Sequence, residues 1–486
     1  MLKNKLYING EWINGSIEMD SVNPETDEII GKVYCAESKD VKASIVAAKE
    51  ALNAWSNLDV RERAKYLTKA SDILVEKYGE EGKETPLKKI IVDEVGKRLP
   101  EADIEVIESS DMLGYFATAG VKLLVDENLQ LNEELWATKR SYVTHDPVGV
   151  VGIIQPWNYP LELPLWAIGA ALIAGNTIVF KPSEYSSLVG LEIAKIFEDA
   201  GLPKGVLNVI TGDASTGKAI VSNNNIDMIS FTGSYQVGKE INIKCAESFK
   251  KTNLELSGND AAIVLDDADL ELTANGIVWG SYCNSGQVCV GAKRIFVHDE
   301  IYDDFIKLVT EKTINLKLGI DIGPIINKNE LQKIKSLVDE AIDKGAILLQ
   351  GGNINDNFFE PTILSNVDFS MQLMKDELFG PILPIIRFSS TEEVIELANN
   401  TQYGLGASIW TQNLALAKSL SKQLNVGMVW INDINIAYPE APWGSIKASG
   451  NGISLSKYGI EKYTNIKHIN YETGKDPTRP WWFPYS

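Results

Sequence analysis

The sequence predicts an α/β protein with a doubly wound, Rossmann-type parallel sheet and a second α/β domain. From Val148 onward, short apolar runs rich in β-branched residues alternate with helical stretches such as Leu188–Ala200. Continuous apolar runs are typical of parallel strands buried on both faces, and this alternation is typical of nucleotide-binding domains. The predicted strands are Val148–Ile154, Thr177–Phe180, Gly205–Ile210 and Asp227–Phe231.

A second α/β series begins near Ala261 and extends through Ile431, which predicts the second domain. The N-terminal part opens with short strand-like pieces and continues with helical patterns, in which apolar residues recur at three- and four-residue spacing. The strand-like pieces are Leu6–Ile8 and Ile29–Val33, and the helical patterns cover Asp40–Leu52 and Arg61–Lys77.

Two segments differ from this α/β pattern. Between Leu124 and Thr144 the chain is polar and mixed, although Lys139–His145 alternates as a strand does. The tail, Asp476–Ser486, contains three prolines, which forbid a regular helix, and several aromatic residues. Because an exposed apolar end is unfavourable, we expect the tail to be buried, either against a neighbouring subunit or against its own.

Composition limits the possible functions. The net charge of −20 over 486 residues disfavours binding to nucleic acids and anionic membranes, which repel an acidic surface. The four cysteines form no CxxC pattern, which favours a reducing compartment over a disulfide framework or a metal site. The N-terminus lacks a secretory apolar core, and Leu161–Phe180 is interrupted as a helix followed by a buried strand would be. We therefore expect a cytoplasmic protein without a metal.

Two short motifs carry the chemistry. Asn284–Cys289 places a cysteine beside a glycine turn, and Leu254–Gly258 places Glu255 in an apolar, glycine-broken run. A single cysteine is usually a small buried hydrophobe, and a single glutamate is usually a solvated surface group. Together they provide a nucleophile and a separate carboxylate base, which covalent chemistry on a carbonyl requires.

Further motifs make the pattern specific. They are Pro156–Pro160 (PWNYP), Lys181–Glu184 (KPSE), Phe231–Ser234 (FTGS) and Glu377–Pro381 (ELFGP). In this order, from Tyr7 to about Lys467, the chain resembles the NAD(P)-dependent aldehyde dehydrogenase superfamily. The resemblance implies a cofactor-binding domain (1–123 and 145–254), a catalytic domain (255–449), and an oligomerisation arm with the C-terminal tail (124–144 and 450–486). It also implies a homodimer or homotetramer.

The resemblance implies a cofactor site without a GxGxxG fingerprint. Phe231, Gly233 and Ser234 follow a strand and should open a helix whose N-terminus offers donors to phosphate. At the end of the second strand, Lys181 and Glu184 would hold the adenosine ribose, where a carboxylate repels a 2′-phosphate and favours NAD over NADP. The nearby lysine leaves NADP possible. The full set adds Ser183, Gly212, Glu377 for the nicotinamide ribose, and Phe379 beside the ring.

The implied reaction is oxidation of an aldehyde to the acid through a thioester. The Cys289 thiolate attacks the aldehyde, and Asn158 with the backbone N–H of Cys289 stabilises the oxyanion. After hydride transfer, Glu255 activates the water that hydrolyses the thioester. One position departs from the family pattern, which usually has two glycines after the base where this chain has Ser257-Gly258.

The aldehyde itself is not determined by the motifs. Trp443, with Tyr159 and Trp166, resembles the aromatic cage of the betaine aldehyde and aminoaldehyde branch, which attracts cations. Cys283 stands where that branch commonly has a bulky aromatic residue. Semialdehydes and small hydroxyaldehydes stay open as substrates. A catalytically silent homologue and a CoA-acylating enzyme are the alternative functions, and the presence of all three catalytic residues argues against the first.

Overall fold

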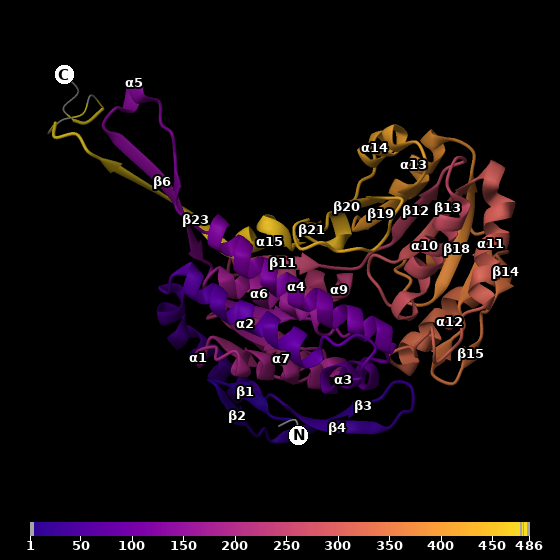
Figure 1. Cartoon of the computed structure of the whole chain (residues 1–486), viewed down its shortest axis with the longest axis horizontal. Coiled ribbons are helices and arrows are strands. Elements are labelled where there is room, and N and C mark those ends of the chain that lie inside the picture. Colours follow the sequence, from indigo (N-terminus) through magenta and orange to yellow (C-terminus); the bar gives the residue numbers. More distant parts are fainter. Residues whose placement is uncertain (1–3, 477–478, 480, 484–486) are drawn as a thin grey trace.

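The computed structural model describes residues 4–476, 479 and 481–483 (Figure 1). It contains two seven-stranded sheets, each covered by helices, and a β arm that projects from the body. The expected α/β class is confirmed. Within the described part of the chain, none of the helices has the length and apolar character needed to span a bilayer.

The first sheet has the order β11-β10-β7-β8-β9-β1-β2. Its first five strands are parallel, and β1 joins β9 in antiparallel orientation at the far edge. The strands are β7 (Val150–Ile154), β8 (Thr177–Lys181), β9 (Leu207–Val209), β10 (Met228–Thr232), β11 (Lys251–Glu255), β1 (Leu6–Ile8) and β2 (Glu11–Ile13). All four strands predicted between Val148 and Phe231 are therefore present.

Helices cover this sheet and supply much of the core. They are α1 (Ser38–Ser56), α2 (Val60–Tyr78), α3 (Pro86–Val95), α4 (Leu99–Leu123), α6 (Glu162–Ile173), α7 (Ser187–Asp199), α8 (Ala214–Ser222) and α9 (Tyr235–Ala246), with the hairpin β3 (Ile17–Val22) and β4 (Ile29–Cys35) beside them. The segment Leu161–Phe180 forms the predicted helix and buried strand, α6 and β8. The sequence analysis did not predict α3 or α4.

The second sheet has the order β14-β17-β18-β13-β12-β19-β20 and is parallel except for β14. Its strands are β12 (Asp260–Val264), β13 (Ala292–His298), β14 (Ile347–Gln350), β17 (Thr362–Ser365), β18 (Ile382–Phe388), β19 (Gly406–Trp410) and β20 (Met428–Ile431), with the small pairs β15 (Ile354–Asn355) and β16 (Phe358–Phe359), β21 (Trp443–Gly444) and β22 (Ile453–Ser454). The flanking helices are α10 (Leu270–Tyr282), α11 (Tyr302–Ile314), α12 (Lys328–Asp343), α13 (Thr391–Asn399) and α14 (Leu414–Ser421).

The β arm consists of β5 (Glu127–Asn128), the short helix α5 (Glu133–Trp136), β6 (Lys139–Pro147) and β23 (Thr464–Glu472), which follows α15 (Ser456–Lys462). β6 pairs with β23 in antiparallel register from Pro147↔Thr464 to Lys139↔Glu472. The tail folds back on this arm, because the rings of Trp481 and Trp136 meet at 5.7 Å. Trp481 and Trp482 remain 51% and 54% exposed, so contact with the own subunit does not bury them. The predicted burial of the tail against a neighbouring subunit stays a prediction, and residues 477–478, 480 and 484–486 of the tail lie outside the described residues.

Candidate active site

The candidate site lies where the chain crosses from the first sheet to the second. β11 ends at Glu255, and after four residues β12 begins in the second sheet at Asp260. The η2 turn (Cys283–Gly286) follows α10, which flanks the second sheet, and leads to Cys289. Gly258 packs so closely that a Cβ there would overlap the carbonyl oxygen of Cys289. The crossing segment and the nucleophile turn are thus in direct contact.

The nucleophile turn has an uncommon backbone. Asn284, Ser285 and Gly286 adopt consecutive positive φ values of 46°, 57° and 73°. A non-glycine residue in this region costs free energy, so the surroundings must hold it. The carboxylate of Glu101 on α4 accepts a 2.5 Å hydrogen bond from the Asn284 N–H, and the Ser285 hydroxyl donates to the Gly323 carbonyl at 2.8 Å. Side chains from distant segments therefore hold the turn that precedes Cys289.

Asn158 lies in the loop between β7 and α6 and is buried. Its side-chain amide donates to the Gln287 carbonyl at 3.0 Å, and the Asn284 amide donates back to the Asn158 carbonyl at 3.0 Å. A carboxamide nitrogen carries two hydrogens, and the bond to Gln287 uses one of them. The predicted oxyanion donor is thus bound to the same turn as Cys289.

Glu255 is buried, and within the described part of the chain neither carboxylate oxygen has a hydrogen-bond partner in good geometry, although the Ser445 hydroxyl interacts with this carboxyl and lowers its pKa. Burial raises the pKa of this carboxyl to about 8. Glu255 and Cys289 line one small cavity of about 20 Å³. Burial, followed by the nearby carboxylates of Glu377, Asp260 and Glu255, raises the pKa of the Cys289 thiol to about 12. Both groups therefore rest mainly in their protonated forms at neutral pH.

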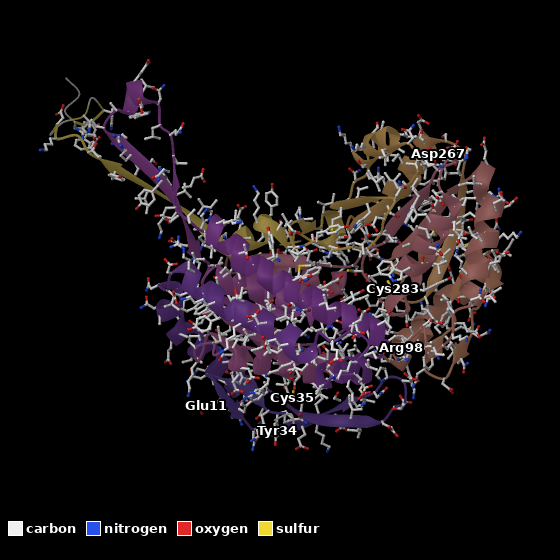
Figure 2. All side chains as sticks on the ribbon, in the orientation of Figure 1. Glu11, Tyr34, Cys35, Arg98, Asp267 and Cys283 are labelled. Atoms are coloured by element: carbon white, nitrogen blue, oxygen red, sulfur yellow. The ribbon has the colours of Figure 1, made fainter. Side chains whose placement is uncertain are left out.

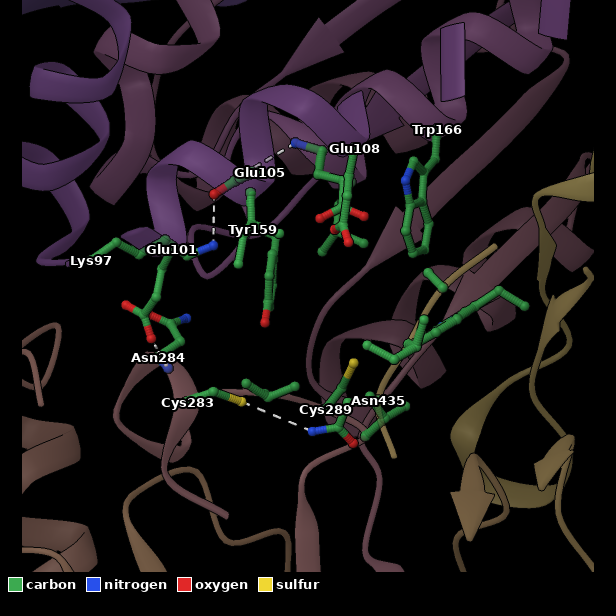
Figure 3. A pocket seen from close by; sticks show the side chains of 18 of the residues that line it. Lys97, Glu101, Glu105, Glu108, Tyr159, Trp166, Cys283, Asn284, Cys289 and Asn435 are labelled. Atoms are coloured by element: carbon green, nitrogen blue, oxygen red, sulfur yellow. Dashed lines mark hydrogen bonds and ion pairs between the residues drawn. The ribbon is translucent and has the colours of Figure 1, made fainter. Parts of the chain in front are cut away.

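Cys289 also lines a second, larger cavity of about 180 Å³ (Figure 3). The structure brings all four predicted substrate residues to its wall: Tyr159, Trp166, Cys283 and Trp443. The Trp166 and Trp443 rings meet edge to face at 5.4 Å, which is a favourable aromatic geometry. The thiol therefore borders both cavities, and Trp166 and Trp443 line the cavity of Glu255 as well.

The sequence analysis missed the charged residues of this larger cavity. Glu101, Glu105 and Glu108 project from α4 (Figure 3). Glu162, which also lines the cavity, is the first residue of α6. Burial raises the pKa of Glu108 to about 7, and burial with the charges of Glu108 and Glu105 raises that of Glu162 well above its usual value. The spacing of Glu101, Glu105 and Glu108 could have predicted this cluster from the sequence, because residues at i, i+4 and i+7 share one helix face.

A lysine compensates part of this negative charge. Lys97 lies 2.6 Å from Glu105, and its ammonium stands 3.5 Å from the Tyr159 ring centroid. The other oxygen of Glu105 accepts hydrogen bonds from the N–H groups of Leu161 and Glu162, at 2.8 and 3.2 Å. Glu105 is thus neutralised and holds the loop that carries Asn158, and one face of Tyr159 is already occupied by a cation.

The predicted ribose-binding residues follow β8. Lys181 is the last residue of that strand, and its ammonium lies 3.8 Å from the Glu184 carboxylate. Burial lowers the pKa of Lys181. The Ser183 hydroxyl accepts from the Tyr185 N–H at 3.2 Å and caps the short helix η1 (Glu184–Ser186). The motif therefore forms one ordered turn at the carboxyl end of the sheet, where dinucleotide-binding folds place their ligand.

The predicted phosphate turn follows β10. Ser234 is the N-cap of α9, and a Cβ at Gly233 would fall 2.5 Å from the Phe231 ring. Gly212, after β9, has a φ of +155° and no room for a side chain beside Thr216. Gly212 precedes α8 and Gly233 precedes α9. Both positions carry backbone without a side chain next to a helix N-terminus, which suits the pyrophosphate of a dinucleotide.

The nicotinamide end of the predicted site lies beside the nucleophile. Glu377 accepts a hydrogen bond from the Gly258 N–H at 3.1 Å, and the Phe379 ring packs against Trp157 at 5.7 Å. A Cβ at Gly286 would overlap the Gly380 carbonyl, so this segment packs on the nucleophile turn. The predicted cofactor residues thus lie after β8, after β10 and beside the nucleophile turn, and their donors and charges fit a dinucleotide.

Comparison with known proteins decides the family. The family model described as "Aldehyde dehydrogenase family" matches residues 12–469. The chain belongs to the aldehyde dehydrogenase family. An aminoaldehyde dehydrogenase of Arabidopsis thaliana is 35% identical over 97% of both chains. A betaine aldehyde dehydrogenase of Bacillus subtilis is 36% identical over 98% of this chain and 99% of that one.

Solved structures agree with this assignment. A betaine aldehyde dehydrogenase from Staphylococcus aureus, crystallised with NAD+, matches with a TM-score of 0.93 at 32% identity, covering 99% of this chain and 97% of that chain. A second solved structure, an NADP-dependent enzyme from E. coli, matches with a TM-score of 0.93 at 35% identity, covering 96% and 98%. This aldehyde dehydrogenase is therefore an oxidoreductase that oxidises an aldehyde with a nicotinamide cofactor and carries a cysteine at the catalytic position.

Proposed function

We propose that this aldehyde dehydrogenase oxidises a short aldehyde that carries a positively charged nitrogen, such as an aminoaldehyde or betaine aldehyde. The observation that carries the proposal is the cavity at Cys289, which combines tryptophan rings with buried carboxylates. The relatives named as aminoaldehyde and betaine aldehyde dehydrogenases support the same class.

The charges of the cavity favour a cation over an anion or a neutral hydroxyaldehyde. Lys97 already pairs with Glu105, which leaves the charges of Glu108 and Glu162 less compensated. Their raised pKa values mean that both carboxyls hold a proton more tightly than a solvated glutamate does. A cationic substrate can replace that proton, while Trp166 and Trp443 offer ring faces and edges to its alkyl or methyl groups.

The residues have complementary roles in the proposed reaction. The Cys289 thiol gives its proton to solvent water in the larger cavity, and its sulfur attacks the carbonyl carbon, which forms the C–S bond of a thiohemiacetal. The second amide hydrogen of Asn158 and the Cys289 N–H donate to the oxyanion. When bound at the residues described above, NAD would supply the acceptor for the hydride of the thiohemiacetal carbon, which would leave that carbon attached to Cys289 as a thioester. Glu255 then takes a proton from water, whose oxygen attacks the thioester carbon and displaces the sulfur.

The same residues suggest the cofactor preference. Glu184 stands at the position that reads the ribose, where its negative charge opposes a 2′-phosphate. Lys181 is buried and paired with Glu184 at 3.8 Å, so it offers little free positive charge to that phosphate. We therefore propose NAD as the preferred cofactor, with NADP used less efficiently.

The test is NADH formation by the purified protein with 3-aminopropionaldehyde, betaine aldehyde, and uncharged alkanals of matched length. Turnover that requires Cys289 and favours the charged substrates supports the proposal. A preference for the alkanals or for succinic semialdehyde would overturn the substrate class. A folded protein that binds NADH but turns over none of these would favour the silent homologue, and strict dependence on CoA would favour the acylating alternative.

We also propose that two or four chains assemble through the arm. β6 and β23 form its ribbon, and Leu135, Trp136 and Trp481 lie exposed near its tip. We propose that the cofactor-binding domain comprises 1–123 and 145–254 and that the catalytic domain comprises 255–449. The arm with the C-terminal tail comprises 124–144 and 450–486. A protein of this composition, with four free cysteines, suits the reducing cytoplasm. Light scattering at micromolar concentration tests the assembly, and a monomer would contradict it.

A further inference from the structure

Ser257 lies in the segment that crosses from β11 to β12, two residues after Glu255, and is 5% exposed. The family pattern usually has a glycine at this position, whereas this chain has a buried hydroxyl. The mechanism above does not use Ser257.

The contacts of Ser257 join three parts of the site. Its hydroxyl oxygen accepts a hydrogen bond from the Tyr235 N–H, in the first turn of α9, at 3.1 Å. The next residue, Gly258, donates its N–H to Glu377 at 3.1 Å. An interaction with the Ser257 side chain lowers the pKa of Glu377, against the larger opposite effect of burial.

A hydroxyl suits this position because it can accept and donate at once. Its acceptor side satisfies an N–H that the start of a helix leaves without an internal partner. Its proton stays available to the Glu377 carboxylate, which the neighbouring Gly258 N–H already binds. A glycine can make neither interaction. Ser257 therefore links the phosphate turn of α9 to Glu377, on the opposite side of the crossing segment.

We propose that Ser257 is a positioning residue that holds the Glu377 carboxylate ready for the nicotinamide ribose. The proposal rests on the proposed cofactor site. In this role Ser257 strengthens binding of the nicotinamide half of the cofactor and leaves binding of the ADP half unchanged.

The experiment measures equilibrium binding without aldehyde, so that the identity of the substrate does not affect it. NADH, ADP-ribose and ADP are titrated into the wild type and Ser257→Ala, because ADP-ribose retains the second ribose and ADP lacks it. We expect NADH and ADP-ribose to bind about fivefold more weakly, which corresponds to one net hydrogen bond, and ADP to bind within twofold. We also expect the defect to grow as the pH falls, because Glu377 loses a donor to its charged form.

Three variants complete the test. Ser449→Ala removes a neighbouring buried hydroxyl that donates to the Ser257 carbonyl at 2.7 Å, and it should leave NADH binding unchanged. Ser257→Thr keeps a hydroxyl and should retain most of the affinity. Glu377→Gln should weaken NADH and ADP-ribose as Ser257→Ala does.

The outcomes separate this inference from the cofactor site beneath it. An equal loss for ADP and NADH in Ser257→Ala would show a general defect of the fold and overturn the proposal. Unchanged NADH binding in Ser257→Ala, with a loss in Glu377→Gln, would overturn the role of Ser257 alone. Unchanged binding in Glu377→Gln would overturn the assignment of Glu377, and the proposal with it.

Discussion

The Glu101 carboxylate accepts a 2.5 Å hydrogen bond from the backbone N–H of Asn284, although the two residues are 183 positions apart. Glu101 belongs to α4, beside the first sheet, and Asn284 to the turn that precedes Cys289 in the second. A charge-assisted bond of this length is strong, and it holds a residue whose φ is positive. The helix layer of one sheet therefore shapes the nucleophile turn of the other.

Replacing Glu101 should distort the turn that precedes Cys289, in addition to removing a negative charge from the cavity. In Glu101→Ala the Asn284 N–H loses its acceptor, and we expect kcat to fall at least tenfold because the strained turn relaxes. Glu101→Gln keeps an acceptor oxygen and should lose much less. The rate of Cys289 alkylation by iodoacetamide should follow the same order. Wild-type turnover in Glu101→Ala would contradict this account.

Hydrolysis should depend on the ionisation of Glu255. Its pKa is raised to about 8 by burial, so the base form increases as the pH rises from 6.5 to 8.5. We expect the rate of thioester hydrolysis to rise over this window and then level. In Glu255→Gln, one equivalent of NADH should form rapidly and turnover should then stop. Rapid-mixing absorbance measures this burst, and sustained turnover in the variant would rule out Glu255 as the base.

The same buried carboxyl should reduce stability at high pH. A folded-state pKa above the unfolded value of 4.5 means that the folded protein binds the proton more tightly. Stability is then lost as the pH rises from 4.5 to about 8. Glu255→Gln should therefore be more stable than the wild type at pH 8, by about 4 kcal/mol, and equal to it at pH 4.5. Denaturant unfolding at both pH values measures the difference, and an equal gain at both would exclude ionisation as its cause.

Binding of a cationic aldehyde should improve as the pH rises. Glu108, whose pKa is raised to about 7, attracts a cation only in its ionised form. We expect the KM for 3-aminopropionaldehyde to fall between pH 6 and pH 8, while the KM for a neutral alkanal of equal length stays constant. Glu108→Gln should raise the first KM and remove its pH dependence. Parallel pH dependence for both aldehydes would count against a role for this carboxyl.

Gly258 should not tolerate a side chain. A Cβ there would overlap the Cys289 carbonyl oxygen, so Gly258→Ala must displace the nucleophile or the crossing segment. We expect kcat/KM to fall about 100-fold, which corresponds to a transition state destabilised by about 2.7 kcal/mol. Gly114→Ala is the matched control, because its nearest neighbour would be the Ser71 hydroxyl at 3.7 Å and alanine favours the helix there. Steady-state kinetics with circular dichroism on both variants checks this.

Several parts of the fold followed from local patterns alone. The β-branched runs predicted β7, β8, β9 and β10 because a strand buried on both faces must be apolar throughout. The glycine turn after β10 predicted the start of α9 for a similar local reason. Helix α4 was not predicted. Several of its charged residues, including Glu105, are buried, whereas charged residues usually mark an exposed surface.

The sequence alone determined the fold class and the family. It also predicted the nucleophile, the base and the amide donor, because each of these three residues lies in a short motif whose residues are neighbours in the chain. Tertiary structure alone decided what surrounds them. It brings Glu105 to Leu161, 56 residues away in the loop that carries Asn158, and Ser257 to Tyr235. The raised pKa values of Glu255 and Glu108 also arise there, because burial depends on the packing of distant segments and has no local signature in the sequence.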